Sequence, residues 1–184
     1  MRPAFVVFAA AAVAQWFLPL AGVWQHERVL AHGVPLRIRC SAPDPYDPLR
    51  GRFLTVRPEQ DRAAAPVGMS GTGPIWATLE AGADGLARIA SLSIEPISGP
   101  NVIRLVARTS GMTDGTPSVS LTWPFDRFYL NERLAPGADA LVAERVRDGQ
   151  KPVAEIRLLD GRAVLTDVFI DGVPIREVVK RRAK

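Results

Sequence analysis

Asp44 and Asp47 are the residues whose type and spacing first suggest chemistry, because carboxylates can bind calcium or move protons. They stand in the stretch DPYDPLRGRFLTV, residues 44–56. The spacing D-P-Y-D lacks the dense series of oxygen ligands that a calcium loop carries. An aspartate also accepts backbone N–H groups and so fixes a turn. We therefore predict that both aspartates cap turns, and we expect no metal site and no cofactor.

Ser41 and Lys151 are the pair that could support nucleophilic catalysis. Type I signal peptidases use a serine and a lysine, and their Arg-Gly stretch before an apolar strand is superficially similar to residues 50–54, RGRFL. A lysine base must be desolvated to lose its proton. Lys151 stands between Gln150 and Pro152, in a predicted turn where it should be solvated. We predict no catalytic residue and favour a protein that is not an enzyme, with a divergent Ser–Lys protease as the alternative.

The other candidate nucleophile is Cys40, and the only candidate imidazole bases are two histidines. Cys40 is the only cysteine, so it can form neither an internal disulfide nor a CxxC pair. It follows the alternating stretch Val34–Arg39, which predicts a buried thiol at the end of a strand. His26 and His32 follow the apolar N-terminal segment, where we expect a surface role and not a catalytic triad.

The charge balance is modest and excludes some classes of partner. The chain has 184 residues, with 23 lysines and arginines against 19 aspartates and glutamates. Its one dense basic run, residues 180–184, has no aromatic or glycine-rich element beside it. We therefore predict a solvated, frayed basic tail and no nucleic-acid partner. The sequence has no GxGxxG or P-loop pattern and identifies no small-molecule substrate.

The N-terminal segment must hold the rest of the chain at its place of work. Residues 4–24, AFVVFAAAAVAQWFLPLAGVW, contain one strongly polar side chain, Gln15. About twenty apolar residues suffice for a helix to cross a bilayer, and Trp16 and Trp24 suit interfacial positions. A signal peptide cleaved after Ala14 is the alternative, but it would leave an exposed apolar segment. We predict an uncleaved membrane anchor, residues 1–27, followed by one domain, residues 28–184.

Short alternating apolar runs dominate the remainder and predict strands, with Gly, Pro and Asp between them. Asp160-Gly161 predicts the hairpin between the last two runs. The predicted strands are residues 34–39, 52–57, 75–79, 86–94, 102–107, 118–123, 127–130, 153–159 and 163–170.

Two other segments complete the predicted organisation. Residues 138–146, ADALVAERV, show the periodicity of an amphipathic helix that ends before Gly149. Residues 58–72 are expected to form a long mobile loop. The fold class is therefore mostly β or α+β: an N-terminal transmembrane helix, then one mainly antiparallel β domain with one late amphipathic helix.

Residues 44–58 resemble the entry and motif of the GDYXXLXY family, small membrane-anchored bacterial proteins. Asp44, Pro45, Asp47, Arg50 and Gly51 match the entry. The named motif falls on residues 51–58 and departs from the family in four places: Arg52 for Asp, Phe53 for Tyr, Val56 for Leu and Pro58 for Tyr. These departures remove the carboxylate and hydroxyl groups of the motif, so a structural role is expected for its matched residues.

The resemblance extends over nearly the whole chain and carries an expectation about function. A helix, a strand preceded by Gly33, an aromatic segment at residues 125–130 and a terminal hairpin ending at residues 171–172 occur in similar order. The family has no established activity, and its members tend to be encoded beside multi-spanning membrane proteins.

The resemblance therefore implies a non-enzymatic accessory or interaction domain that works with such a protein. It would be a single-pass protein of the bacterial inner membrane, with its soluble domain in the periplasm. Positive-inside counting favours the cytoplasm instead, because Arg28, Arg37 and Arg39 follow the apolar segment. An envelope ligand-binding module is a further alternative.

Overall fold

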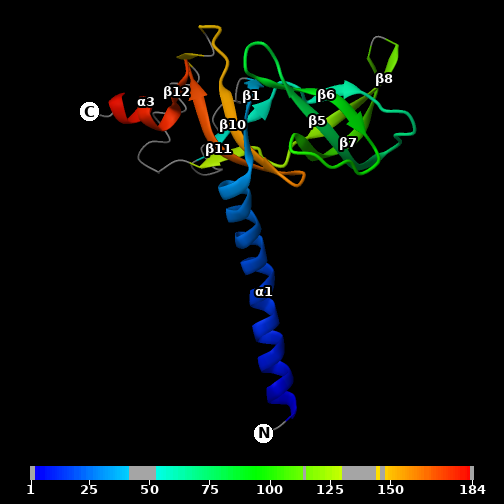
Figure 1. The fold of residues 1–184 in the computed structure, drawn as a ribbon, viewed down its shortest axis with the longest axis vertical. Helices are drawn as coiled ribbons and strands as arrows, with labels where there is room; N and C mark the ends of the chain where they lie inside the picture. The colour runs from blue at the N-terminus through cyan, green and yellow to red at the C-terminus, as the bar shows by residue number, and fades with distance from the viewer. Residues whose placement is uncertain (1–2, 42–52, 114, 130–143, 146–147, 183–184) are drawn as a thin grey trace.

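A long N-terminal helix projects from a body of short strands in the computed structural model of the chain (Figure 1). The structure describes residues 3–41, 53–113, 115–129, 144–145 and 148–182, without the side chains of residues 3–6, 9–10, 113 and 181–182. All strand pairs among the named strands are antiparallel. The predicted class, mostly β and antiparallel, is therefore confirmed.

The elements follow one another with short connections in the described part of the chain. They are α1 (Pro3–His32), β1 (Val34–Ser41), β2 (Phe53–Thr55), β3 (Arg57–Pro58), β4 (Arg62–Ala64), β5 (Thr72–Ala81), β6 (Ala87–Ser93), β7 (Val102–Thr113), β8 (Thr116–Thr122), β9 (Arg127–Tyr129), β10 (Val153–Leu159), β11 (Arg162–Ile170), β12 (Val173–Pro174) and α3 (Ile175–Arg182).

The strands form two five-stranded sheets and one pair. The first sheet has the order β12-β11-β10-β1-β3, the second has the order β4-β8-β7-β5-β6, and β2 pairs with β9. Side chains alternate between the two faces of a strand. In β1 this places Ile38 and Cys40 in the interior, whereas Arg37 and Arg39 face outward beside Glu155 and Asp84.

Two apolar clusters lie under the first sheet. The larger one joins its helix-proximal half to the second sheet through Ile38, Ile156 and Leu158, which pack with Ile75, Leu79, Ile103 and Leu105. The smaller one joins Cys40, Ala154 and Val168 to the β2–β9 pair and to α3, through Leu54, Phe128, Ile175 and Val179. The first sheet thus connects every other part of the body.

Two-residue turns of one type close both ends of β11. Asp160 and Gly161 have φ values of 50° and 76°, and Asp171 and Gly172 have 54° and 74°. Two successive positive φ values define the type I′ turn, which suits the twist of a hairpin. The predicted Asp160-Gly161 hairpin is confirmed, and it sets the register Leu159↔Arg162.

Residues 58–72 were expected to be a mobile loop, and this prediction is wrong for part of the segment. Pro58 belongs to β3, and Arg62–Ala64 forms β4 against β8. Gln60 lies between them and bonds two elements: its side-chain oxygen accepts the Ile89 N–H at 2.8 Å, and its carbonyl accepts the Trp123 Nε1–H at 3.0 Å. These contacts join residues that are far apart in the chain, so no local sequence pattern predicts them.

The first residues of the C-terminal basic run, residues 180–184, are helical and do not form the frayed tail that was predicted. Residues 175–182 form helix α3, which includes Lys180 and ends at Arg182. Its apolar side chains Ile175 and Val179, one turn apart, are buried in the smaller cluster. Residues 183–184 lie outside the described part of the chain, as does the predicted helix 138–146 except for Glu144 and Arg145, which are helical.

Helix α1 continues past the predicted anchor to His32 and includes Pro19. Among the described residues, no helix meets the length and hydropathy needed to cross a bilayer. The described residues therefore do not support the expected transmembrane helix.

Candidate interaction surfaces

The family-like motif forms a short strand that pairs with the aromatic segment far along the chain. Phe53 lies opposite Tyr129, and Leu54 lies opposite Phe128. Leu54 and Phe128 point into the smaller apolar cluster. Phe53 and Tyr129 lie on the other face, with their ring centroids 6.0 Å apart. The pairing therefore creates a small aromatic surface on the outside of the body.

Arg127 adds positive charge to this aromatic surface. Its guanidinium carbon lies 4.8 Å from the centre of the Phe53 ring, within the range of a cation–π contact. Its Nε is 3.6 Å from the carboxylate of Asp126. Tyr129 keeps 67% of its surface exposed. We call Phe53, Asp126, Arg127 and Tyr129 the motif surface.

Val56 ends the motif strand and explains why the predicted strand 52–57 divides into β2 and β3. Its backbone N–H donates to the carbonyl of Asp126 at 2.8 Å, and its side chain is buried in the smaller cluster. Arg57 then pairs with Ser41 of β1 instead of β9. The chain therefore leaves the β2–β9 pair and joins the edge of the first sheet.

The five residues that match the family entry lie outside the described part of the chain. Asp44, Pro45, Asp47, Arg50 and Gly51 fall within residues 42–52. Their predicted role in fixing turns therefore stays a prediction. Phe53 and Val56 are described, and each has a structural contact: Phe53 with Tyr129 and Arg127, and Val56 with Asp126.

The register of the first sheet brings Ser41 and Lys151 near one another, but their contacts do not form a catalytic pair. Arg39 pairs with Val153, and the Cys40 N–H donates to the Pro152 carbonyl, so the two residues extend the same register. Lys151 forms an ion pair with Glu59, and its side chain is 56% exposed. The Ser41 hydroxyl donates to the Arg57 carbonyl at 3.2 Å. Each side chain therefore has another partner: Lys151 has the Glu59 carboxylate, and Ser41 has the Arg57 carbonyl.

Cys40 is buried at the end of β1, as the sequence predicts. Desolvation raises the pKa of its thiol to about 12, partly offset by a backbone hydrogen bond from Ala154. The Sγ lies 3.7 Å from the Ile38 carbonyl. The neutral thiol is neither a nucleophile nor a metal ligand.

The junction between α1 and β1 consists of one residue, Gly33. Its N–H donates to the Val29 carbonyl at 2.8 Å, and its own carbonyl accepts a bond from Arg157 at 3.4 Å. A Cβ on Gly33 would lie 2.4 Å from the Val29 carbonyl oxygen and 3.1 Å from the Leu158 nitrogen. Only glycine fits this close approach. The last turn of α1 is therefore fixed against the first sheet.

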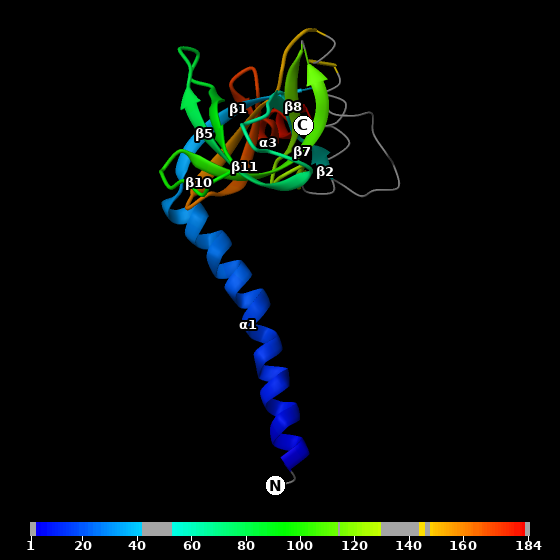
Figure 2. The same cartoon turned by 90° about the vertical axis from the view of Figure 1, so that its right-hand side faces the viewer.

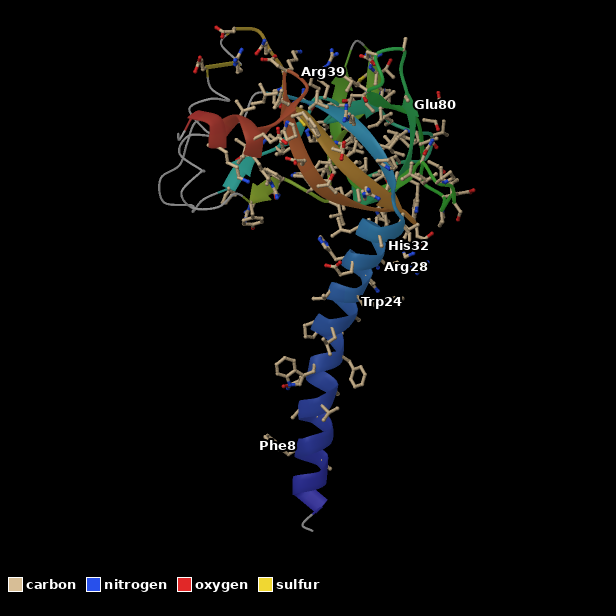
Figure 3. All side chains as sticks on the ribbon, turned by 60° about the vertical axis from the view of Figure 1, so that its left-hand side comes forward. Phe8, Trp24, Arg28, His32, Arg39 and Glu80 are labelled. Atoms are coloured by element: carbon tan, nitrogen blue, oxygen red, sulfur yellow. The ribbon has the colours of Figure 1, made fainter. Side chains whose placement is uncertain are left out.

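A salt bridge ties the same helix end to a hairpin. Arg28 lies 3.3 Å from the carboxylate of Asp160, in the β10–β11 turn, and its guanidinium also stands over the Trp24 ring (Figure 3). Val29, on the inner side of α1, is 3% exposed. Sequence reasoning placed Trp24 and Arg28 beside a membrane but missed their connection to the hairpin, because residues 28 and 160 are far apart in the chain.

Sequence reasoning also missed the strand pairing that forms the motif surface. The segment 125–130 was predicted as an aromatic strand, but no local signal selects β2 as its neighbour. The alternation of Arg127, Phe128 and Tyr129 does show which of the three must face inward. No group of three or more metal-binding side chains occurs among the described residues.

Comparison with known protein families gives a match. A family model described as GDYXXLXY protein matches residues 15–168, which is most of the chain. No curated protein and no solved structure matches the chain.

Proposed function

Because this chain belongs to the GDYXXLXY family, we propose that it is a non-enzymatic accessory domain, anchored in a membrane by α1 and working with a multi-spanning membrane protein. The body would present the motif surface to that protein, and α1 would hold the body at the bilayer.

The exposed apolar surface of α1 is the observation that carries this proposal. Trp16, Phe17 and Leu18 are consecutive, so they point in directions about 100° apart, and all three are exposed. The same holds along the rest of the helix: its exposed apolar side chains also include Val7, Phe8, Val13, Leu20, Val23 and Trp24. A helix that is apolar on all sides needs an apolar environment around it.

The full sequence of the apolar stretch, which includes residues whose side chains the structure does not describe, has a length that suits a bilayer. Residues 4–24 carry no charged side chain, and as a helix they extend about 30 Å, close to the thickness of the hydrocarbon core. Trp24 would lie near the interface, followed at once by the polar residues 25–28. Figure 1 shows this part of α1 standing clear of the body.

The motif surface is the part of the body that suits a protein partner. Aromatic side chains and arginine are enriched at protein interfaces, and this surface places the exposed ring of Tyr129 and the half-buried ring of Phe53 beside a guanidinium. We expect the partner to be the multi-spanning protein and the contact to lie at the membrane surface. The catalytic alternative has no comparable support, because Lys151 is paired with Glu59 and solvated.

Affinity purification in mild detergent tests the partner. The full chain should recover a multi-spanning membrane protein, and Tyr129→Ala should reduce that recovery. Met112→Ala is the matched control, because Met112 is also an exposed apolar side chain, at 72%, but lies on the β7–β8 hairpin. Repeated recovery of the chain alone, or equal losses with both variants, would contradict the proposal.

Topology tests the proposed location in the bacterial inner membrane. Alkaline phosphatase fused after Lys184 should be active, because we place the body in the periplasm. An inactive but stable fusion would move the body to the cytoplasmic side while leaving the anchor itself in place. Extraction at alkaline pH should leave the chain with the membrane, whereas release would contradict the anchor.

A further inference from the structure

We propose that the β10–β11 turn and the first residues of β7 form a membrane-contacting foot that binds the phosphate groups of anionic lipids beside α1. The foot consists of Arg28, Arg104, Asp160, Gly161 and Arg162. This inference rests on the proposed anchor and adds a second, electrostatic contact between the body and the bilayer.

The foot is held together by backbone contacts between the two sheets. The Arg104 N–H donates to the Gly161 carbonyl at 2.8 Å, and Ile103 forms a parallel bridge with Gly161. The Arg28–Asp160 salt bridge joins the turn to α1. Figure 1 and Figure 2 both show the end of the β10–β11 hairpin beside the end of α1, on the side of the body toward which the helix projects.

The height of the foot along α1 matches the lipid headgroups. If Trp24 lies at the edge of the hydrocarbon core, Arg28 lies about 6 Å further out, because each helical residue rises about 1.5 Å. The headgroup layer is about 5 to 8 Å thick on each side of the bilayer. Asp160 contacts Arg28 directly, so the turn would be in this layer.

Two arginines of the foot have no counter-charge among the residues that the structure describes. Arg104 and Arg162 are exposed, and neither makes an ion pair within the described part of the chain. The Arg104 guanidinium stands over the Trp76 ring at 5.9 Å, as Arg28 stands over Trp24 at 5.8 Å. Arginine and tryptophan side chains each have an apolar part and a polar end, so both suit the membrane interface.

The fixed junction at Gly33 makes the foot possible. A flexible linker would let the body turn freely over the bilayer, but here one glycine connects helix and strand, and Val29 is buried against the body. The same part of the body would therefore face the lipid whenever α1 spans it. Of the five residues of the foot, three are arginines and one is acidic, Asp160, which is paired with Arg28.

A fluorescent label tests which side of the body meets the lipid. Cys40 is buried and stays unlabelled, so Arg162→Cys and Thr116→Cys in the full chain each provide one labelling site. Thr116 is exposed and belongs to the β7–β8 hairpin, on the far side of the body from α1 (Figure 1). In vesicles containing a lipid with a spin-labelled headgroup, the label at residue 162 should be quenched and the label at residue 116 should not.

Lipid charge and a matched pair of variants test the role of the arginines. Adding phosphatidylglycerol to phosphatidylcholine vesicles should increase quenching at residue 162. Arg104→Gln should reduce that increase, corresponding to about a fivefold loss in the equilibrium constant for headgroup contact. Arg108→Gln is the control, because Arg108 is also exposed on β7 but lies about 13 Å further from Gly161. In the Arg108→Gln variant, the phosphatidylglycerol-dependent increase in quenching at residue 162 should stay unchanged.

The outcomes separate this inference from the anchor. If the chain does not float with the vesicles, the anchor fails and the foot fails with it. If it floats but both labels are quenched equally, only the foot is overturned. The electrostatic contact is overturned if quenching does not depend on phosphatidylglycerol. It is also overturned if Arg104→Gln and Arg108→Gln have equal effects. If no quenching occurs at residue 162 in pure lipid vesicles, the lipid contact of the foot is overturned.

Discussion

Leu18 of α1 and Ile156 of β10 are similar in size and hydrophobicity but have opposite environments. Leu18 is 81% exposed, whereas Ile156 is 0% exposed in the larger apolar cluster. In the body, polar and apolar side chains alternate, so each strand buries one face. In the first part of α1 the apolar side chains surround the helix, and no other element of the described chain covers them.

The comparison teaches that this protein has two uses for apolar surface. The body uses most of it to fold, in two buried clusters. The apolar side chains in the first part of α1 are exposed, so they are available for the membrane contact that we propose. The two regions meet at the Gly33 junction, where Val29 on one face of the helix is buried against the body.

The largest effect should come from shortening a buried side chain in the body. Ile156→Ala should lower the free energy of unfolding by about 2 to 5 kcal/mol, because it leaves a cavity under the first sheet. Leu18→Ala should leave the unfolding of the body unchanged. Urea unfolding in detergent, followed through the fluorescence of the buried Trp123, measures both. Similar losses in the two variants would break the distinction between helix and body.

The next effect tests the boundary between the two regions. Gly33→Ala should destabilise the body by about 1 to 3 kcal/mol, because the new Cβ would overlap the Val29 carbonyl. Gly22→Ala is the matched control: nothing lies within 4 Å of its added Cβ, and alanine favours a helix by about 1 kcal/mol. In thermal unfolding monitored by circular dichroism, the midpoint should fall for Gly33→Ala, whereas it should rise or stay unchanged for Gly22→Ala.

A smaller effect should come from the turn that contacts the helix end. Asp160 has a φ of 50°, and alanine there should cost about 1 kcal/mol relative to glycine. Asp160→Ala and Asp160→Gly both remove the Arg28 salt bridge, so their difference isolates the backbone. Equal unfolding midpoints for the two variants would mean that the strain is absent.

The smallest effect concerns the end of the first sheet away from α1, where Arg39 lies in Figure 3. The pKa of Asp84 is lowered, first by the hydrogen bond that its carboxylate accepts from the Leu86 N–H, and also by Arg88 and Arg39. A lowered pKa contributes stability above the ordinary value of 3.8, which is lost as the pH falls through the lower folded value.

The unfolding midpoint should therefore fall more steeply on acidification in the unmodified chain than in Asp84→Asn. Asp126→Asn serves as the control, since Asp126 is also an exposed aspartate beside an arginine, but it lies on the motif surface. Urea midpoints at about pH 3 and about pH 7 measure the difference. Identical acid dependence with and without the Asp84 carboxylate would remove it from the contacts that link β1 to β6.

The sequence predicted local features of the fold well where a short pattern is sufficient. Alternation identified nearly all the longer strands, Asp160-Gly161 identified a hairpin, and the position of Cys40 after Val34–Arg39 identified a buried thiol. It failed at residues 58–72 and 175–182, where short elements are held by distant partners. β4 needs β8, and α3 needs the smaller apolar cluster, so neither is stable as a local unit.

For the candidate surfaces, too, the sequence indicated single strands but not the contacts between distant elements. The motif strand could be recognised from residues 44–58, but its contact with Tyr129 and Arg127 could not, because they are remote in the chain. The foot likewise joins residues 28, 104 and 160–162 from three elements. A sequence window contains the pattern of one strand, whereas the choice of neighbour depends on how whole faces fit together.

The sequence by itself determined the β class and an apolar segment at residues 4–24, because these depend on patterns of period two and on composition, and its resemblance at residues 44–58 indicated the family. Only the tertiary structure decided that Gly33 joins α1 to the body without a linker, and that the β10–β11 turn lies beside the helix end. The physical reason is that local patterns fix which face of an element is apolar, whereas close packing between distant elements fixes where that face points.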